Sequence, residues 1–248
     1  MAHKPLRILC FGDSLTSGYF SFGMDSHPYS LQLEDRLTGA LPNVDVQIVT
    51  NGVPGDVATF ERFADRMRAE CNKHTFDWAI VLAGTNDLAY GISPTNIYEC
   101  LQNVWNIPIS KGSKVLALTV PECEARSERL VKRRDELNRS ILAHQQPNYY
   151  SFDLKDRIPY HSLSEREREK YWDDGLHLRD DGYDWMGDHI ANALLRIILQ
   201  EANPEPGTST TRRRSSKHVK DDLALDEETG NPRNLHEGYV VVRKKDLD

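Results

Sequence analysis

Cysteines, long apolar stretches and an excess of positive charge are lacking in this sequence, and each lack excludes a class of protein. The four cysteines among 248 residues stand far apart, so they match neither a zinc motif nor a disulfide framework. No apolar stretch approaches the roughly 20 residues that cross a membrane, and the first residues lack the apolar region of a signal peptide. We therefore expect a cytoplasmic protein with reduced cysteines, no metal site and no stable insertion into a membrane.

The negative net charge limits the partners of the protein. Acidic residues outnumber basic ones by 38 to 31, which gives a net charge of -7. A negative surface repels the phosphates of nucleic acids and of anionic lipids. We therefore expect no nucleic acid partner and no anionic membrane as the main partner.

Apolar residues are also few, and the C-terminal part of the chain accounts for some of that shortage. The hydrophobic fraction is 39% and the mean hydropathy is -0.60. Residues 203–248 are rich in proline, serine, threonine and charge, and they show no apolar periodicity before Tyr239. Such a segment buries too little apolar surface to fold. We expect one folded domain over residues 5–202 and a disordered charged tail over 203–248, free to bind an unknown protein partner.

The rest of the chain alternates short apolar runs with segments of helical periodicity. This alternation predicts a doubly wound α/β fold with a five-stranded parallel sheet in the flavodoxin-like order 2-1-3-4-5. Strands are expected at residues 6–11, 44–50, 78–83, 114–120 and 149–152. Longer helices are expected at 29–41, 57–73, 93–109, 124–144 and 181–201, with a short charged one at 164–170.

Polar residues follow three of the predicted strands, beside glycines. They are Gly12-Asp13-Ser14 after the first strand, the segment 51–56 after the second and Gly84-Thr-Asn-Asp after the third. In a sheet of this type, the strand ends around the switch point are where ligands bind. A fourth polar segment, 174–177, precedes the last helix.

These segments contain the groups that acyl transfer requires. A serine hydroxyl becomes a nucleophile only beside a base, and that base needs a group to orient it. Of the nine histidines, only His177 has an aspartate three residues earlier, at Asp174. Backbone N–H groups at the glycine-rich strand ends and the amide of Asn86 are suitable donors to an oxyanion. Singly, each residue also suits a structural role in a turn or a helix cap, but the four segments together favour catalysis.

The same four segments resemble the GDSL, or SGNH, hydrolase family of esterases and lipases. The defining Gly-Asp-Ser-Leu stands intact at residues 12–15. The family's later motifs match Gly55-Asp56, the Gly-x-Asn-Asp at residues 84–87, and the Asp-x-x-His at 174–177. The resemblance covers residues 8 to about 200 and does not reach the tail. The Gly-x-Ser-x-Gly elbow of α/β-hydrolases is missing.

The resemblance implies a three-layer α/β/α fold and a serine esterase that needs no cofactor. Ser14 would be the nucleophile, His177 the base and Asp174 the residue that orients it. The N–H groups of Ser14 and Gly55, with the Asn86 amide, would form the oxyanion hole.

The resemblance leaves the substrate open. We expect a serine carboxylic-ester hydrolase that acts through an acyl-enzyme on small or short-chain acyl esters, because no insertion of lid size is visible. A thioesterase or a carbohydrate O-deacetylase would use the same residues. From a different class, the chain could be a non-catalytic α/β binding module whose tail recruits a partner. Apolar side chains near the predicted site are candidates for contact with the substrate: Phe20, Leu88, Tyr90 and Trp172.

Overall fold

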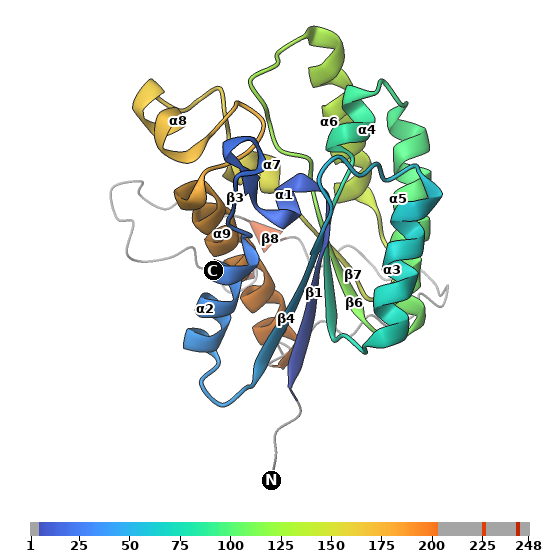
Figure 1. Ribbon diagram of the computed structural model, residues 1–248. Coiled ribbons are helices and arrows are strands. Elements are labelled where there is room, and N and C mark those ends of the chain that lie inside the picture. The colour runs from blue at the N-terminus through green and yellow to red at the C-terminus, as the bar shows by residue number, and fades with distance from the viewer. Residues whose placement is uncertain (1–4, 203–224, 227–241, 244–248) are drawn as a thin grey trace. The chain divides into compact units, whose positions relative to one another are not determined.

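A five-stranded parallel sheet organises the protein. The computed structural model describes residues 5–202, 225–226 and 242–243. The strand order is β4-β1-β5-β6-β7, which confirms the predicted order (Figure 1). The strands are β1 (Leu6–Gly12), β4 (Val46–Gly52), β5 (Trp78–Leu82), β6 (Lys114–Leu118) and β7 (Tyr149–Phe152).

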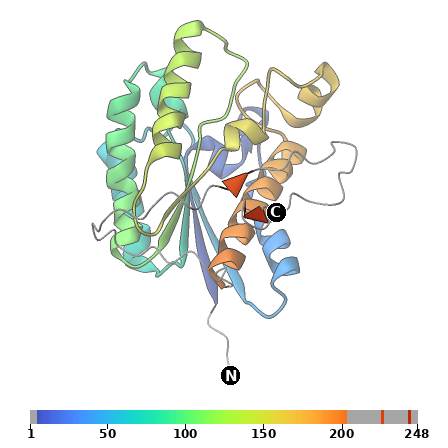
Figure 2. The same ribbon diagram turned by 180° about the vertical axis from the view of Figure 1, so that it is seen from behind.

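Helices cover both faces of the sheet, so the architecture has three layers, as expected. Helices α2 (Ser30–Ala40) and α9 (Asp180–Ala202) lie together on one face. Helices α3 (Glu61–Lys73), α5 (Pro94–Ser110) and α6 (Glu128–Ala143) cover the other. The reverse view in Figure 2 shows the same separation.

The apolar run of β1 explains why both faces are covered. Successive side chains of a strand point to opposite faces of the sheet. Ile8 and Cys10 therefore pack in the cluster that includes α2 and α9. Leu9 and Phe11 pack in the cluster that includes α3, α5 and α6, and all four side chains are fully buried. Cys10 is therefore a core residue.

Several short elements were not predicted. A one-turn helix, α1 (Ser14–Ser17), begins directly after β1, where we expected a loop that extends to Pro28. A small hairpin follows, with β2 (Tyr19–Phe20) and β3 (Asp25–Ser26) joined through η1 (Ser21–Gly23). Elements this short show no hydrophobic period, which is why the sequence pattern missed them. The others are α4 (Thr85–Ala89) and α7 (Leu154–Arg157); the predicted charged helix is α8 (Glu165–Tyr171).

Two helices begin four residues later than predicted. Helix α3 begins at Glu61 and not at residue 57, because the N–H groups of Ala58 and Thr59 donate to the carboxylate of Asp87. Helix α6 begins at Glu128, where the Ser127 side chain caps it. No helix among the described residues is long and apolar enough to cross a membrane.

In the C-terminal segment the structure describes two short strands, β8 (Leu225–Asp226) and β9 (Val242–Arg243). They pair antiparallel with each other. The predicted disorder of the tail concerns residues that otherwise lie outside the described ones.

Candidate active site

Ser14 lies at the end of β1, where a close approach between strands fixes its position. A Cβ atom on Gly12 would lie 2.2 Å from the carbonyl oxygen of Leu82 in β5, so only glycine fits there. Asp13 then caps α1, because its Oδ1 accepts the N–H of Leu15 at 3.0 Å. Ser14 is therefore the first residue of α1, and it is 7% exposed.

The structure brings together the three residues that the sequence predicted as a triad. His177 Nε2 lies 2.9 Å from Ser14 Oγ, and His177 Nδ1 lies 2.8 Å from Asp174 Oδ2. The Ser14 and His177 side chains come from segments 163 positions apart in the chain. A serine, an imidazole and a carboxylate in this series have the geometry of nucleophile, base and orienting group.

Asp174 is held by its own loop and stays ionised. Its Oδ1 accepts the N–H groups of Leu176 at 3.0 Å and of His177 at 2.8 Å. Partial burial raises the pKa of Asp174. The hydrogen bonds from the His177 side chain and from these two N–H groups lower it by a larger amount. The net result is a pKa below its usual value, so the carboxylate is ready to accept from Nδ1. The ring of Tyr19 lies against the imidazole, with centroids 4.7 Å apart.

The three donors predicted for an oxyanion hole follow three neighbouring strands, β1, β4 and β5. In the first turn of α1, Asp13 accepts the N–H groups of residues 15–17, which leaves the N–H of Ser14 without an acceptor in that turn. Gly55 has a φ of 74°, and a Cβ atom at this position would meet no heavy atom within 4 Å, so its backbone borders open space. The Asn86 amide donates to the carbonyl of Asp56 at 2.8 Å, and its second N–H remains available.

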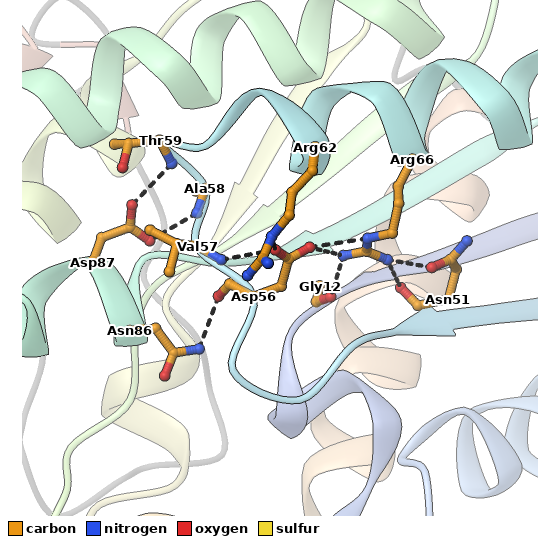
Figure 3. A network of polar contacts seen from close by, with 10 residues as sticks. All are labelled: Gly12, Asn51, Asp56, Val57, Ala58, Thr59, Arg62, Arg66, Asn86 and Asp87. Atoms are coloured by element: carbon orange, nitrogen blue, oxygen red, sulfur yellow. Dashed lines mark hydrogen bonds and ion pairs between the residues drawn. The ribbon is translucent and has the colours of Figure 1, made fainter.

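An ion-pair network around the buried carboxylate of Asp56 fixes the loop that contains Gly55 (Figure 3). Asp56 is 2% exposed, and its carboxylate accepts from Arg62 Nε at 2.7 Å and from Arg66 Nε at 3.0 Å. Arg66 also donates to the carbonyl of Gly12 at 2.8 Å and to both oxygen atoms of Asn51. One guanidinium therefore joins the ends of β1 and β4 to the residue that follows Gly55.

A second carboxylate fixes the other side of the same loop. Asp87 is fully buried, and its two oxygens accept the N–H groups of Ala58 and Thr59, both at 2.9 Å. Asn86, the preceding residue, holds the carbonyl of Asp56 (Figure 3). Helix α4 and the segment 55–59 are therefore tied together at three points. Asp56 and Asp87 belong to the recognised motifs, whereas nothing in the sequence distinguishes Arg66 from the other arginines of α3.

A cavity of about 260 Å³ opens beside the triad. Its lining includes Leu15 from α1, Asn86 and Leu88 from α4, Asp174 from its loop and the buried Arg134 from α6. Of the four residues predicted to contact substrate, only Leu88 is among the described residues that line this cavity.

The structure places the other three elsewhere. Phe20 packs against the core beside α9, and Trp172, 4% exposed, is part of that core. Tyr90 is 72% exposed. Contact of these three side chains with a substrate stays a prediction. Among the described residues, no group of His, Cys, Asp or Glu side chains could hold a metal ion.

The fold and the site define a three-layer α/β/α hydrolase with a Ser-His-Asp arrangement at the carboxyl ends of the strands. A profile of the GDSL-like Lipase/Acylhydrolase family matches residues 10–185, more than half of the chain. The chain therefore belongs to this GDSL, or SGNH, family, and it is an acyl ester hydrolase by class.

Individual relatives are distant. An arylesterase of Vibrio mimicus is 23% identical over 198 residues, which cover 77% of this chain and 90% of the relative. The lipase/acylhydrolase of Enterococcus faecalis is similar in structure, with a TM-score of 0.61, 23% identity and coverage of 76% and 94%. A family 3 carbohydrate esterase of Clostridium thermocellum has a TM-score of 0.63, 18% identity and coverage of 81% and 100%. At these identities the two structures show a common fold.

Proposed function

We propose that the protein is a serine carboxylic-ester hydrolase that forms an acyl-enzyme at Ser14 and acts on small or short-chain acyl esters. The observation that supports this most directly is the continuous contact from Ser14 Oγ through His177 to Asp174, at 2.9 and 2.8 Å.

In the first step, Ser14 Oγ attacks the ester carbonyl while His177 Nε2 accepts the hydroxyl proton. Asp174 stabilises the imidazolium that forms, and the N–H groups of Ser14, Gly55 and Asn86 hold the oxyanion. His177 then returns the proton to the leaving alcohol. In the second step, His177 takes a proton from water, whose oxygen attacks the acyl carbon. The bond from the acyl carbon to Ser14 Oγ then breaks, His177 returns the proton to Oγ, and the carboxylic acid leaves.

The size of the cavity favours a small substrate. A space of about 260 Å³ is slightly smaller than the usual small-molecule site, and it suits a short acyl chain or a small alcohol. A thioester or an O-acetyl carbohydrate would fit the same chemistry, and the fold similarity to a carbohydrate esterase keeps the latter as an alternative. A cytoplasmic location, the absence of a cofactor and a tail over 203–248 that binds a protein partner stay predictions.

Replacement of Ser14 tests the proposal. We expect Ser14→Ala to lower kcat for p-nitrophenyl acetate and butyrate by about a thousandfold or more, with an unchanged circular dichroism spectrum. A fluorophosphonate should label Ser14 in the wild-type protein and fail to label the variant, as read by peptide mass spectrometry.

The matched control is Ser26→Ala. This serine is exposed in β3, and its hydroxyl donates to the carbonyl of Ser17 and touches no triad residue. It should keep wild-type kinetics and labelling. Full activity of Ser14→Ala would refute Ser14 as the nucleophile, and a wild-type protein without turnover or labelling would favour the non-catalytic binding module.

A further inference from the structure

Arg134 is a buried cation for which the described residues provide no anion. The residue lies in α6 and is 3% exposed. Its guanidinium donates to the Cys123 sulfur at 3.3 Å, and it forms no ion pair with a described Asp or Glu side chain. A thiol is a weak acceptor, and a guanidinium has five N–H donors. Burial of an unpaired charge is costly, so arginines in protein interiors are normally paired.

Arg66, in contrast to Arg134, has a carboxylate partner and several hydrogen-bond acceptors. It is more exposed than Arg134, yet it pairs with the Asp56 carboxylate and donates to Gly12 and Asn51. Arg134 has nothing comparable. It does line the cavity beside the triad, together with Asn86 and Asp174. The donors of Arg134 that lack an acceptor among the described residues therefore belong to a side chain that lines this cavity.

We propose that this cavity receives esters that contain a carboxylate on a short apolar spacer, and that Arg134 binds this carboxylate. The inference rests on the proposed ester hydrolysis and specifies its substrate class. The apolar lining residues Leu88, Val120 and Leu130 contact the spacer. The reacting carbonyl lies at Ser14 and Asn86, and the remote carboxylate lies at Arg134.

The acidic residues that line the cavity favour a single negative charge at this one position. Glu122 Oε2 accepts the N–H groups of Tyr160 at 2.9 Å and His161 at 3.1 Å, and Asp174 is bound to His177. Glu124 is exposed. Their negative charges repel an anion from the rest of the cavity, so Arg134 is the position in the cavity where an anion is favoured. One guanidinium neutralises a carboxylate, whereas a phosphate dianion would keep one uncompensated charge near these residues.

The carboxylate can belong to either half of the ester, so the test uses both. Monoethyl succinate has it on the acyl side, and 3-acetoxypropanoate has it on the alcohol side. The neutral comparisons are ethyl levulinate and 4-acetoxybutan-2-one, in which a methyl ketone replaces the carboxylate. We expect the wild-type kcat/KM for one of the anionic esters to exceed that of its neutral counterpart by about tenfold or more, the ratio that one charge-assisted hydrogen bond supplies.

Substitution of Arg134 should remove this preference selectively. Arg134→Met should lower kcat/KM for the anionic ester by about tenfold or more and change that for the neutral ester by less than about threefold. Arg134→Lys should retain part of the preference, because it keeps the charge but loses the planar fork. Arg139→Met, which removes an exposed arginine from the same helix, should keep the wild-type preference.

Two results would overturn the inference. One is a wild-type protein that shows no preference for the anionic ester of either pair, a measurement that needs no variant to fold. The other is an equal loss on anionic and neutral esters in the folded Arg134 variants, which would assign Arg134 a structural role. If the protein neither hydrolyses p-nitrophenyl acetate nor reacts with a fluorophosphonate, the proposed function itself fails. Hydrolysis of neutral esters without an anionic preference refutes only the role of Arg134.

Discussion

At the scale of single residues, two adjacent aspartates have separate tasks. Asp174 accepts from His177 Nδ1 at 2.8 Å, whereas Asp173 accepts the N–H of Ser21 at 2.8 Å. With Asn at position 174, the amide N–H₂ can turn toward Nδ1. This contact favours the tautomer with its proton on Nε2, which cannot accept from Ser14. We expect Asp174→Asn to lower kcat by about a hundredfold or more, with a smaller change in KM.

Asp173→Asn is the matched control for this prediction. It changes the same chemical group one position away and leaves the imidazole contacts in place, so its kcat should stay within about threefold of wild type. The low pKa of Asp174 keeps its carboxylate ionised well into the acidic range. The wild-type carboxylate is therefore present across the pH range of the assays, and the deficit of Asp174→Asn should persist at about pH 8. Equal kinetics for the two variants would contradict the assigned orienting role.

Asp13, the neighbour of the proposed nucleophile, links stability to pH. Its Oδ2 is buried and has no hydrogen-bond partner among the described residues. Burial raises the pKa of Asp13 to about 7, although the hydrogen bond from Leu15 lowers it. An unfolded aspartate titrates near about 3.9. Between about pH 4 and pH 7 the folded state therefore binds more protons than the unfolded state, and the free energy of unfolding falls as the pH rises.

Urea titrations of the wild type and Asp13→Asn across this range isolate the effect. Asparagine keeps the helix cap but does not titrate. We expect the stability of the variant relative to wild type to increase by a few kcal/mol between about pH 4 and pH 8, with most of the change complete by about pH 7. A difference between the two proteins that does not vary with pH would show that Asp13 is ionised throughout.

At the scale of elements, Arg66 makes α3 a support for the loop that contains Gly55. It joins Asp56 to the carbonyl of Gly12 and to Asn51, and its guanidinium lies 4.4 Å from the centre of the Phe11 ring. Loss of this support should displace the Gly55 N–H from the oxyanion position. We expect Arg66→Met to lower kcat by about tenfold to a hundredfold and to change KM less than about threefold.

Binding of a trifluoromethyl ketone separates this positioning role from a general loss of stability. The hemiketal oxyanion it forms with Ser14 uses the same donors as the transition state, so its affinity should fall in parallel with kcat/KM. Arg68→Met, which removes an exposed arginine paired with Asp65 on the same helix, should change neither. If inhibitor affinity is unchanged while kcat falls, Arg66 does not act through the oxyanion hole.

Elements with a local signal were predictable from the sequence, and those without one were not. The helix expected from residue 93 is α5, which begins at Pro94, where the Ser93 hydroxyl accepts the N–H of Asn96. Helices α1 and α4 are too short to show a period. The sequence does not distinguish Arg66 and Arg134 from the other arginines of their charged amphipathic helices. Which of these side chains is buried depends on the elements that pack against the helix, and the local sequence does not show this. The motif residues could be named in advance, whereas the arginines that support or line the site could not.

At the scale of the whole molecule, the parallel sheet explains why residues far apart in the chain share one site. Strands β1, β4 and β5 are neighbours and end at the same edge, so the loops with Ser14, Gly55 and Asn86 follow from the strand order. The loop with Asp174 and His177 precedes α9 and completes the site. Because the order was predictable from the alternation of elements, the meeting of these loops was predictable too. Their distances were not.

The same organisation predicts that residues beyond Ala202 are dispensable for hydrolysis. The fully buried apolar side chains of the described residues lie between Ile8 and Leu194, and the proposed catalytic residues lie between Ser14 and His177. A chain that ends after Ala202 should keep kcat/KM within about twofold of the full chain and lose only a few degrees of Tm.

A chain that ends after Met186 is the contrasting control for this truncation. It lacks Ile190 and Leu194, which are fully buried in the cluster shared by α2 and α9. Loss of two such side chains costs on the order of 5 kcal/mol or more, comparable with the whole stability of a domain, so this chain should not fold. If the chain ending after Ala202 is also inactive or unfolded, residues 203–248 contribute to the catalytic domain. The boundary predicted from composition would then be wrong.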